Sequence, residues 1–106
     1  MSVKTEEVFK GDIGTQFVLT LTDDGAVVDI SASTTKQFYF RKPDGSAKTV
    51  TAEFVTDGTD GQLKYTTVSG DIDQAGYWEI QARIEMGGGD WASSRKEFRV
   101  HDRIVA

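Results

Sequence analysis

The spacing of Asp71 and Asp73 is the first pattern in this sequence that could do chemistry. Carboxylate oxygens at alternate positions open the loops that bind calcium, and a glycine such as Gly76 supplies the sharp turn. An EF-hand also needs oxygen donors where this chain has Ala75 and Ala82, so that site is excluded. Two other carboxylates could complete a different cation site: Asp12 and Asp60. Hydrated turn carboxylates are the simpler interpretation, and we expect no metal.

Catalysis by proton transfer or nucleophilic attack needs a base with a pKa near neutrality, and the only histidine is His101. No cysteine is present to act with it as a nucleophile. The glycines at 87–89 could suggest a phosphate-binding loop, but such loops lead into a helix or a Lys-Ser/Thr pair, and here a strand is expected next. They are interpreted as a hairpin loop. We therefore expect neither an enzyme nor a cofactor.

Acidic residues outnumber basic ones: 17 Asp and Glu against 12 Lys and Arg in 106 residues, a formal charge of −5. This balance repels polyphosphate and argues against nucleic acid as a partner. The absence of cysteine excludes disulfides and thiolate metal sites, which suits a reducing cytoplasm. The sequence has no basic and apolar leader and no membrane-length apolar run, so we expect neither signal-directed export nor a membrane location.

The elements that must position these residues show the period-2 alternation of strands with one buried face. It is clearest in Phe17–Thr22, Thr35–Arg41 and Tyr77–Met86, the last of which is the longest strand predicted. Residues that favour turns follow these strands: Asp23-Asp24-Gly25, Pro43-Asp44-Gly45 in type I geometry, and the glycines at 87–89.

Weaker alternation predicts the remaining strands. Three are short: one around Val28 and Ile30, one at 50–54, and one at 63–67. The strands at 35–41, 50–54 and 63–67 are predicted to form a meander. Residues 69–76 break the alternation and are predicted to cross between two sheets, with a helical turn near Ile72. The last strand, at 91–101, is predicted to carry a bulge within 93–96.

About seven or eight short strands with hairpin-length loops and no helical periodicity predict an all-β fold. The predicted architecture is an immunoglobulin-like antiparallel β-sandwich over residues 10–101. Residues 1–9 are predicted to be an N-terminal arm or an edge strand, and residues 102–106 a C-terminal tail. One domain is expected, because a chain of this length buries a single core.

Arginine and tyrosine gather at the outward positions of the third, penultimate and last of these strands, and both are favoured at protein interfaces. Together with a tryptophan beside the hairpin, the candidate interface residues are Tyr39, Arg41, Tyr77, Arg83, Trp91 and Arg99. The alternative is a solvated sheet face on which the arginines pair across strands with Glu79, Glu85 and Glu97. For Trp91, capping of the core is the simpler interpretation, and an anchor in a partner is the other.

Three segments carry a resemblance to a known family. Asp73-Gln74-Ala75-Gly76-Tyr77-Trp78 stands where an immunoglobulin-like domain has its Asp-x-Gly-x-Tyr corner, with Trp78 at the corner aromatic position and Ile80 at that of the second cysteine. Gly11-Asp12-Ile13-Gly14-Thr15 precedes the first core strand, and Phe40-Arg41-Lys42-Pro43-Asp44-Gly45 follows the third. In order and spacing, over Lys10 to Val100, these segments resemble the N-terminal domain of phage baseplate upper proteins.

The resemblance implies an immunoglobulin-like module of the tail baseplate that docks on neighbouring virion proteins without enzymatic activity. We therefore expect a non-catalytic bacteriophage virion structural protein that mediates protein–protein assembly in the tail or baseplate and is made in the cytoplasm of the bacterial host. Its expected partners are other virion proteins and further copies of itself. Longer relatives continue into a helical linker and a platform for receptor-binding proteins, so a chain ending at Ala106 suggests a stand-alone tail, neck or capsid decoration protein.

An alternative function is a capsid or tail decoration module that binds carbohydrate on the host surface. Three aromatic residues expected at the surface favour it: Tyr39, Tyr77 and Trp91. This function predicts glycan binding that is lost when Trp91 is replaced by alanine.

Overall fold

The computed structural model describes residues 8–93 and 95–104 of the chain. These residues form strands and turns and include no helix, so the all-β fold class is confirmed, and nothing among them is a helix long and apolar enough to cross a membrane. The strands are β1 (Val8–Phe9), β2 (Gln16–Thr20), β3 (Thr22–Asp23), β4 (Ala26–Val27), β5 (Thr35–Arg41), β6 (Ala47–Thr51), β7 (Glu53–Phe54), β8 (Gln62–Thr66), β9 (Gly76–Met86), β10 (Gly89–Ala92) and β11 (Lys96–His101). They outnumber the predicted strands because several of those are interrupted.

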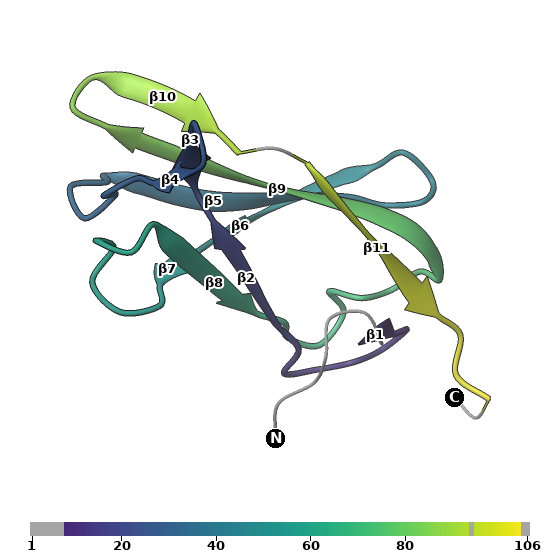
Figure 1. The fold of residues 1–106 in the computed structure, drawn as a ribbon. Coiled ribbons are helices and arrows are strands. Elements are labelled where there is room, and N and C mark those ends of the chain that lie inside the picture. Colours follow the sequence, from purple (N-terminus) through teal and green to yellow (C-terminus); the bar gives the residue numbers. More distant parts are fainter. Residues whose placement is uncertain (1–7, 94, 105–106) are drawn as a thin grey trace.

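Two sheets form the sandwich (Figure 1). The larger has the order β1-β11-β9-β5-β6, with β10 also pairing with β9, and the smaller has the order β2-β8-β7. A separate hairpin, β3-β4, continues from β2. The order β11-β9-β5 facing β2-β8-β7 is that of strands G-F-C facing B-E-D in immunoglobulin domains, so the sandwich is consistent with the predicted class.

Two of the three clearest runs have accurate boundaries, whereas the predicted strand Phe17–Thr22 is divided into β2, which ends at Thr20, and β3, which begins at Thr22. Strand β5 has the predicted ends, and β9 begins one residue earlier than predicted. The turn after β5 is also as predicted, because the Gly45 N–H donates to the Lys42 carbonyl at 2.9 Å. The short strand predicted around Val28 and Ile30 lies instead at β4, although Ile30 is fully buried.

The predicted meander is wrong. Strand β6 pairs with β5 in the larger sheet, whereas β7 pairs with β8 in the smaller one, so the chain changes sheets between them. Ala52 lies at this change, and its N–H makes the last bond to β5, at 3.0 Å from the Lys36 carbonyl. Because Val50, Ala52 and Phe54 all face the core, the alternation continues across the change and does not reveal it.

Residues 69–76 cross between the sheets as predicted, but without the predicted helical turn. The Asp71 N–H donates to the Val68 carbonyl at 3.1 Å, and the Asp71 carboxylate accepts the Val68 N–H at 2.8 Å. This reciprocal pair closes a tight turn, which is why no helical turn forms. Ile72, the apolar residue that suggested a helix, is buried in the core.

The last predicted strand is divided into β10 and β11, which both pair with β9. Ala92 lies opposite Arg83 and Lys96 lies opposite Ile80, so three residues on this strand face two on β9. One additional residue on one strand is the defining feature of a β-bulge, as predicted for this segment. Within it, the Ser93 hydroxyl accepts a backbone N–H of β9 at 2.9 Å.

Aromatic rings fill the centre of the core. The Phe40 ring lies with its centroid 5.5 Å from Phe17, 6.3 Å from Trp78 and 6.3 Å from Phe98, mostly in edge-to-face contact. Trp78 is 1 % exposed, and its indole N–H donates to the Gln74 carbonyl at 3.0 Å. A buried aromatic residue that bonds back to the backbone a few residues upstream is the corner that the resemblance places at Trp78.

The N-terminal and C-terminal segments lie together at one edge of the larger sheet. Val8 is fully buried and pairs in parallel with Val100, so residues 8–9 form an edge strand, one of the two alternatives predicted. Arg103 donates to the Lys10 carbonyl at 2.8 Å and to the Asp12 carboxylate at 2.6 Å. The predictions for residues 1–7 and 105–106 lie outside the described residues.

Gly61 provides a test of the packing between β8 and the loop that follows β4. Its φ of +71° is unfavourable for other residues, and a Cβ would lie 2.8 Å from the Val28 carbonyl oxygen and 2.9 Å from that of Leu21. We expect Gly61→Ala to lower the free energy of unfolding by about 2–3 kcal/mol in urea denaturation. Gly45 is the matched control, because its φ is also positive but its Cβ would meet no atom. Equal losses in the two variants would contradict the steric explanation.

Candidate functional site

Five of the six candidate interface residues project from the solvent-facing side of the larger sheet, as predicted. We call the solvent side of β5, β9, β10 and β11 the outer face. Its candidate residues are Tyr39 and Arg41 on β5, Tyr77 and Arg83 on β9, and Arg99 on β11. The alternate residues of the same strands, such as Phe38 and Ile80, are buried in the core.

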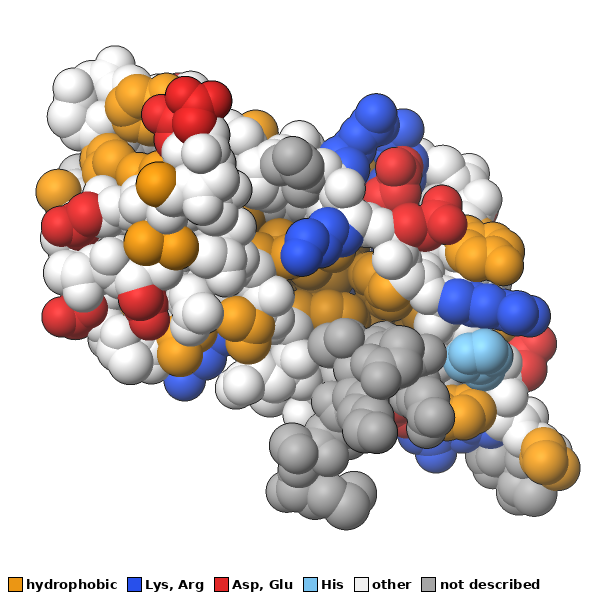
Figure 2. Space-filling model, in the orientation of Figure 1, with side chains coloured by type: hydrophobic (Ala, Val, Ile, Leu, Met, Phe, Trp, Pro, Cys, Tyr) orange, Lys and Arg blue, Asp and Glu red, His pale blue; other side chains and the backbone are white. Residues whose placement is uncertain are grey.

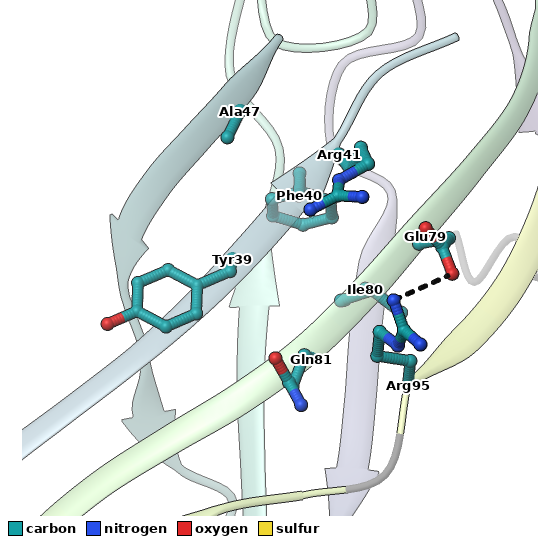
Figure 3. Close-up of a pocket in the computed structure, with 8 residues that line it drawn as sticks. All are labelled: Tyr39, Phe40, Arg41, Ala47, Glu79, Ile80, Gln81 and Arg95. Carbon is teal, nitrogen blue, oxygen red and sulfur yellow. Dashed lines mark ion pairs between the residues drawn. The ribbon is translucent and has the colours of Figure 1, made fainter. Parts of the chain in front are cut away.

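A shallow depression of about 230 Å³ lies on the outer face between β5 and β9 (Figure 3). The side chains around it are Tyr39, Arg41, Ala47, Glu79, Gln81 and Arg95. Arg95 points toward Glu79, with the nearest nitrogen and oxygen 3.9 Å apart. At that distance and with Arg95 62 % exposed, the pair is weak.

Three arginines on the outer face keep most of their hydrogen-bonding capacity. Arg41 is exposed and makes no ion pair with the described residues. Arg99 lies over the Tyr77 ring, with its guanidinium carbon 5.7 Å from the ring centroid, and Tyr77 is 60 % exposed. With Arg95, these residues make a basic and aromatic surface on an acidic chain.

Arg83 is engaged by neighbouring side chains. Its Nε and Nη2 donate to the two Asp90 carboxylate oxygens at 3.0 and 2.9 Å, and Nη1 donates to Gln37 at 2.9 Å. Glu85 lies 3.0 Å from Nη2. The Asp90 contact raises the pKa of Arg83 above its ordinary value. Arg83 therefore pairs with neighbouring side chains, which is the solvated-face alternative. The interface hypothesis remains for the arginines toward the other end of the outer face: Arg41, Arg95 and Arg99.

Comparison with known protein families finds a match for this sandwich. The family model for the BppU N-terminal domain, where BppU is the baseplate upper protein, matches residues 4–105. The chain belongs to this family. As a BppU N-terminal domain it is a phage baseplate structural protein and a component of the virion. A search of curated proteins found no match to the chain.

Trp91 does not share the outer face of this BppU N-terminal domain. It pairs with Ile84, whose side chain is buried, so Trp91 projects to the inner side of the sheet and remains 51 % exposed. It lines a groove of about 680 Å³ between β2-β3 and β9-β10, with Leu21, Val28 and Met86 among the other residues. Apolar side chains are visible between β2 and β11 in Figure 2. The pairing register across the hairpin, in which Gly89 lies opposite Met86, places Trp91 opposite Ile84 and therefore on the inner side.

Arg95 and Gln81 were not among the predicted site residues. Gln81 alternates outward with Glu79 and Arg83, so its position was readable from the pattern of β9. Arg95 lies in the bulge, where the alternation is lost, and only its cross-strand neighbours place it beside Glu79. The Gln81 amide donates to the Ser93 carbonyl at 2.7 Å, which ties this part of β9 to the bulge.

The carboxylates that suggested a calcium loop are occupied by side chains of the BppU N-terminal domain. Asp71 is buried, forms an ion pair with Lys48, and accepts the Tyr65 hydroxyl at 2.5 Å. Asp73 pairs with Lys42 at 2.9 Å. The described residues contain no cluster of three or more His, Cys, Asp or Glu suited to a metal.

Burial alone would raise the pKa of Asp71. Hydrogen bonds from Lys48, Tyr65 and the Val68 N–H outweigh that effect and lower the pKa below its ordinary value of 3.8. Burial, together with the negative Asp71, raises the pKa of Tyr65 to about 12. This network joins β6 and β8 to the crossing segment, and its role is structural.

Proposed function

We propose that this baseplate domain is a non-catalytic binding module that assembles with neighbouring virion proteins through its outer face. The observation that carries the proposal is the depression beside Arg41 and Arg95, two arginines with little internal pairing in a chain of net charge −5. Tyr39 borders it and Tyr77 lies elsewhere on the same outer face, and arginine with tyrosine is the composition that favours interfaces.

The chemistry of this surface favours a partner that presents carboxylates. A guanidinium holds a carboxylate through two parallel hydrogen bonds, and the depression has room for a side chain of that size.

The carbohydrate alternative is less well supported. A shared aromatic platform would need Tyr39, Tyr77 and Trp91 on one surface, whereas Trp91 lies on the opposite side of the sheet. His101, the residue considered for catalysis, has its ring centroid 5.6 Å from that of Phe9, at the sheet edge. The position of Trp91 therefore favours protein binding over carbohydrate binding.

Charge reversal on the outer face tests the proposal. Phage that encodes the full-length protein with Arg41→Glu should incorporate at least about tenfold less of it into washed particles, because a like charge opposed to a partner's carboxylate costs several kcal/mol. Quantitative mass spectrometry of purified virions measures the amount. Lys10→Glu is the matched control: it makes the same change of charge at an exposed residue on the other edge of the domain. Normal incorporation of the Arg41 variant would contradict the proposal.

A further inference from the structure

The cross-strand register of the outer face carries a more specific conclusion about the partner. We infer that the outer face binds a second copy of itself, with a two-fold axis parallel to β9. This inference rests on the proposed function, because it names the partner of the same surface. A two-fold interface joins the same patch of both copies, so each contact occurs twice.

The first step is the arrangement of charge across the strands. Arg41 on β5 lies opposite Glu79 on β9, and Glu79 lies opposite Glu97 on β11. One row across the outer face therefore has a cation at one flank and an anion at the other. Arg41 and Glu97 are both exposed, and neither makes an ion pair with the described residues. Glu79, in the middle, has Arg95 as its neighbour.

The second step is the effect of the symmetry. Rotation about an axis along β9 places β5 of one copy over the β10-β11 side of the other while keeping each row at the same height. Arg41 of each copy then faces Glu97 of the other. Sheets that pack face to face lie about 10 Å apart, a gap that an arginine and a glutamate span together.

The remaining rows are compatible with the same arrangement. Two more pairs follow from the registers of β5, β9 and β10: Gln37 with Ala92, and Thr35 with Asp90. Neither of them opposes like charges. The outward residues of β6, beside β5, are small: Ala47, Thr49 and Thr51. They leave room for the flank of the second copy.

The residues on the axis meet their own counterparts. Tyr77, 60 % exposed, supplies apolar area there, and Gln81 is uncharged. Three charged residues meet their own counterparts: Glu79, Arg83 and Glu85. Arg95 lies beside Glu79, and Arg83 and Glu85 form an ion pair within each copy, which reduces the repulsion. Because each copy also carries a net charge of −5, the association should be weak and should depend on the Arg41–Glu97 contacts.

A charge exchange within one chain tests this inference. In sedimentation equilibrium over a concentration series, the purified wild-type protein should dimerise, and Arg41→Glu or Glu97→Arg should each raise the dissociation constant at least about tenfold. The double variant R41E/E97R should restore it to within a few-fold of wild type, because both contacts reform with exchanged signs. Lys10→Glu should leave the dissociation constant unchanged. Circular dichroism verifies that each variant is folded.

Each alternative outcome overturns the inference. A wild-type protein that stays monomeric at every concentration excludes the dimer, and a double variant as weak as the single ones excludes this pairing. The proposed function is judged separately by incorporation into virions. A monomeric wild type combined with loss of Arg41→Glu from particles would retain the proposed function and identify the partner as a different virion protein.

Discussion

Replacing Trp78 with alanine should lower the free energy of unfolding by about 3–5 kcal/mol, the range for a fully buried aromatic residue. The indole is 1 % exposed and packs against Phe40 and Phe98, with ring centroids 6.3 and 5.9 Å away. Its loss opens a cavity between the two sheets and leaves the Gln74 carbonyl without its donor. A loss of that size is a large part of the stability of a domain of this length.

Urea unfolding monitored by far-ultraviolet circular dichroism measures this change. Trp78→Phe is the matched variant, because it keeps most of the ring packing and removes the N–H donated to Gln74. It should cost about 1–2 kcal/mol. Trp91→Ala should cost much less than Trp78→Ala, since Trp91 is 51 % exposed. A loss below about 1 kcal/mol in Trp78→Ala would contradict a central role for this corner.

Replacing Asp71 with asparagine should lower the free energy of unfolding at pH 7 by about 2 kcal/mol, the scale of charge-assisted hydrogen bonds. The substitution keeps the volume of the side chain but removes the negative charge that Lys48 and the Tyr65 hydroxyl contact. Asp73→Asn is the control. Its partner Lys42 makes an exposed ion pair, which contributes about 0–1 kcal/mol.

The stability that Asp71 contributes to the fold should depend on pH. The pKa of Asp71 is lowered in the folded protein, so its contribution is fully present above the unfolded value of 3.8 and is lost as the pH falls through the folded pKa. The difference in stability between wild type and Asp71→Asn should therefore be constant near neutrality and narrow below about pH 4. Urea midpoints measured across this range test it, and a difference that stays constant into acid would contradict the assignment.

Regular alternation predicted individual strands better than it predicted their interruptions and their partners. Thr35–Arg41 has Phe38 and Phe40 on its inner side, and its strand was predicted to the residue. The segment 50–54 has an equally regular pattern, yet it belongs to two sheets. A period-2 pattern reports which side of a strand is buried, and it does not report which strand lies beside it.

The outer face shows the same division between what was predictable and what was not. The outward positions of Tyr39, Arg41 and Tyr77 follow from alternation alone. Arg83 is hydrogen-bonded to Gln37 and Asp90, which come from two other strands, whereas Arg41 makes no ion pair with the described residues. Alternation along one strand does not reveal this difference. Trp91, for which the sequence left core capping and a partner anchor as alternatives, lies on the inner side of the sheet opposite Ile84 and remains 51 % exposed.

By itself the sequence determined the all-β class, the longest strands, the corner at Trp78 and the family resemblance, because these depend on local alternation, turn residues and spacing. Only the tertiary structure decided the change of sheet at Ala52, the use of Asp71 by Lys48, and which arginines of the outer face stay unpaired. Those features arise from contacts between residues far apart in the chain, and such contacts are set by strand pairing and packing.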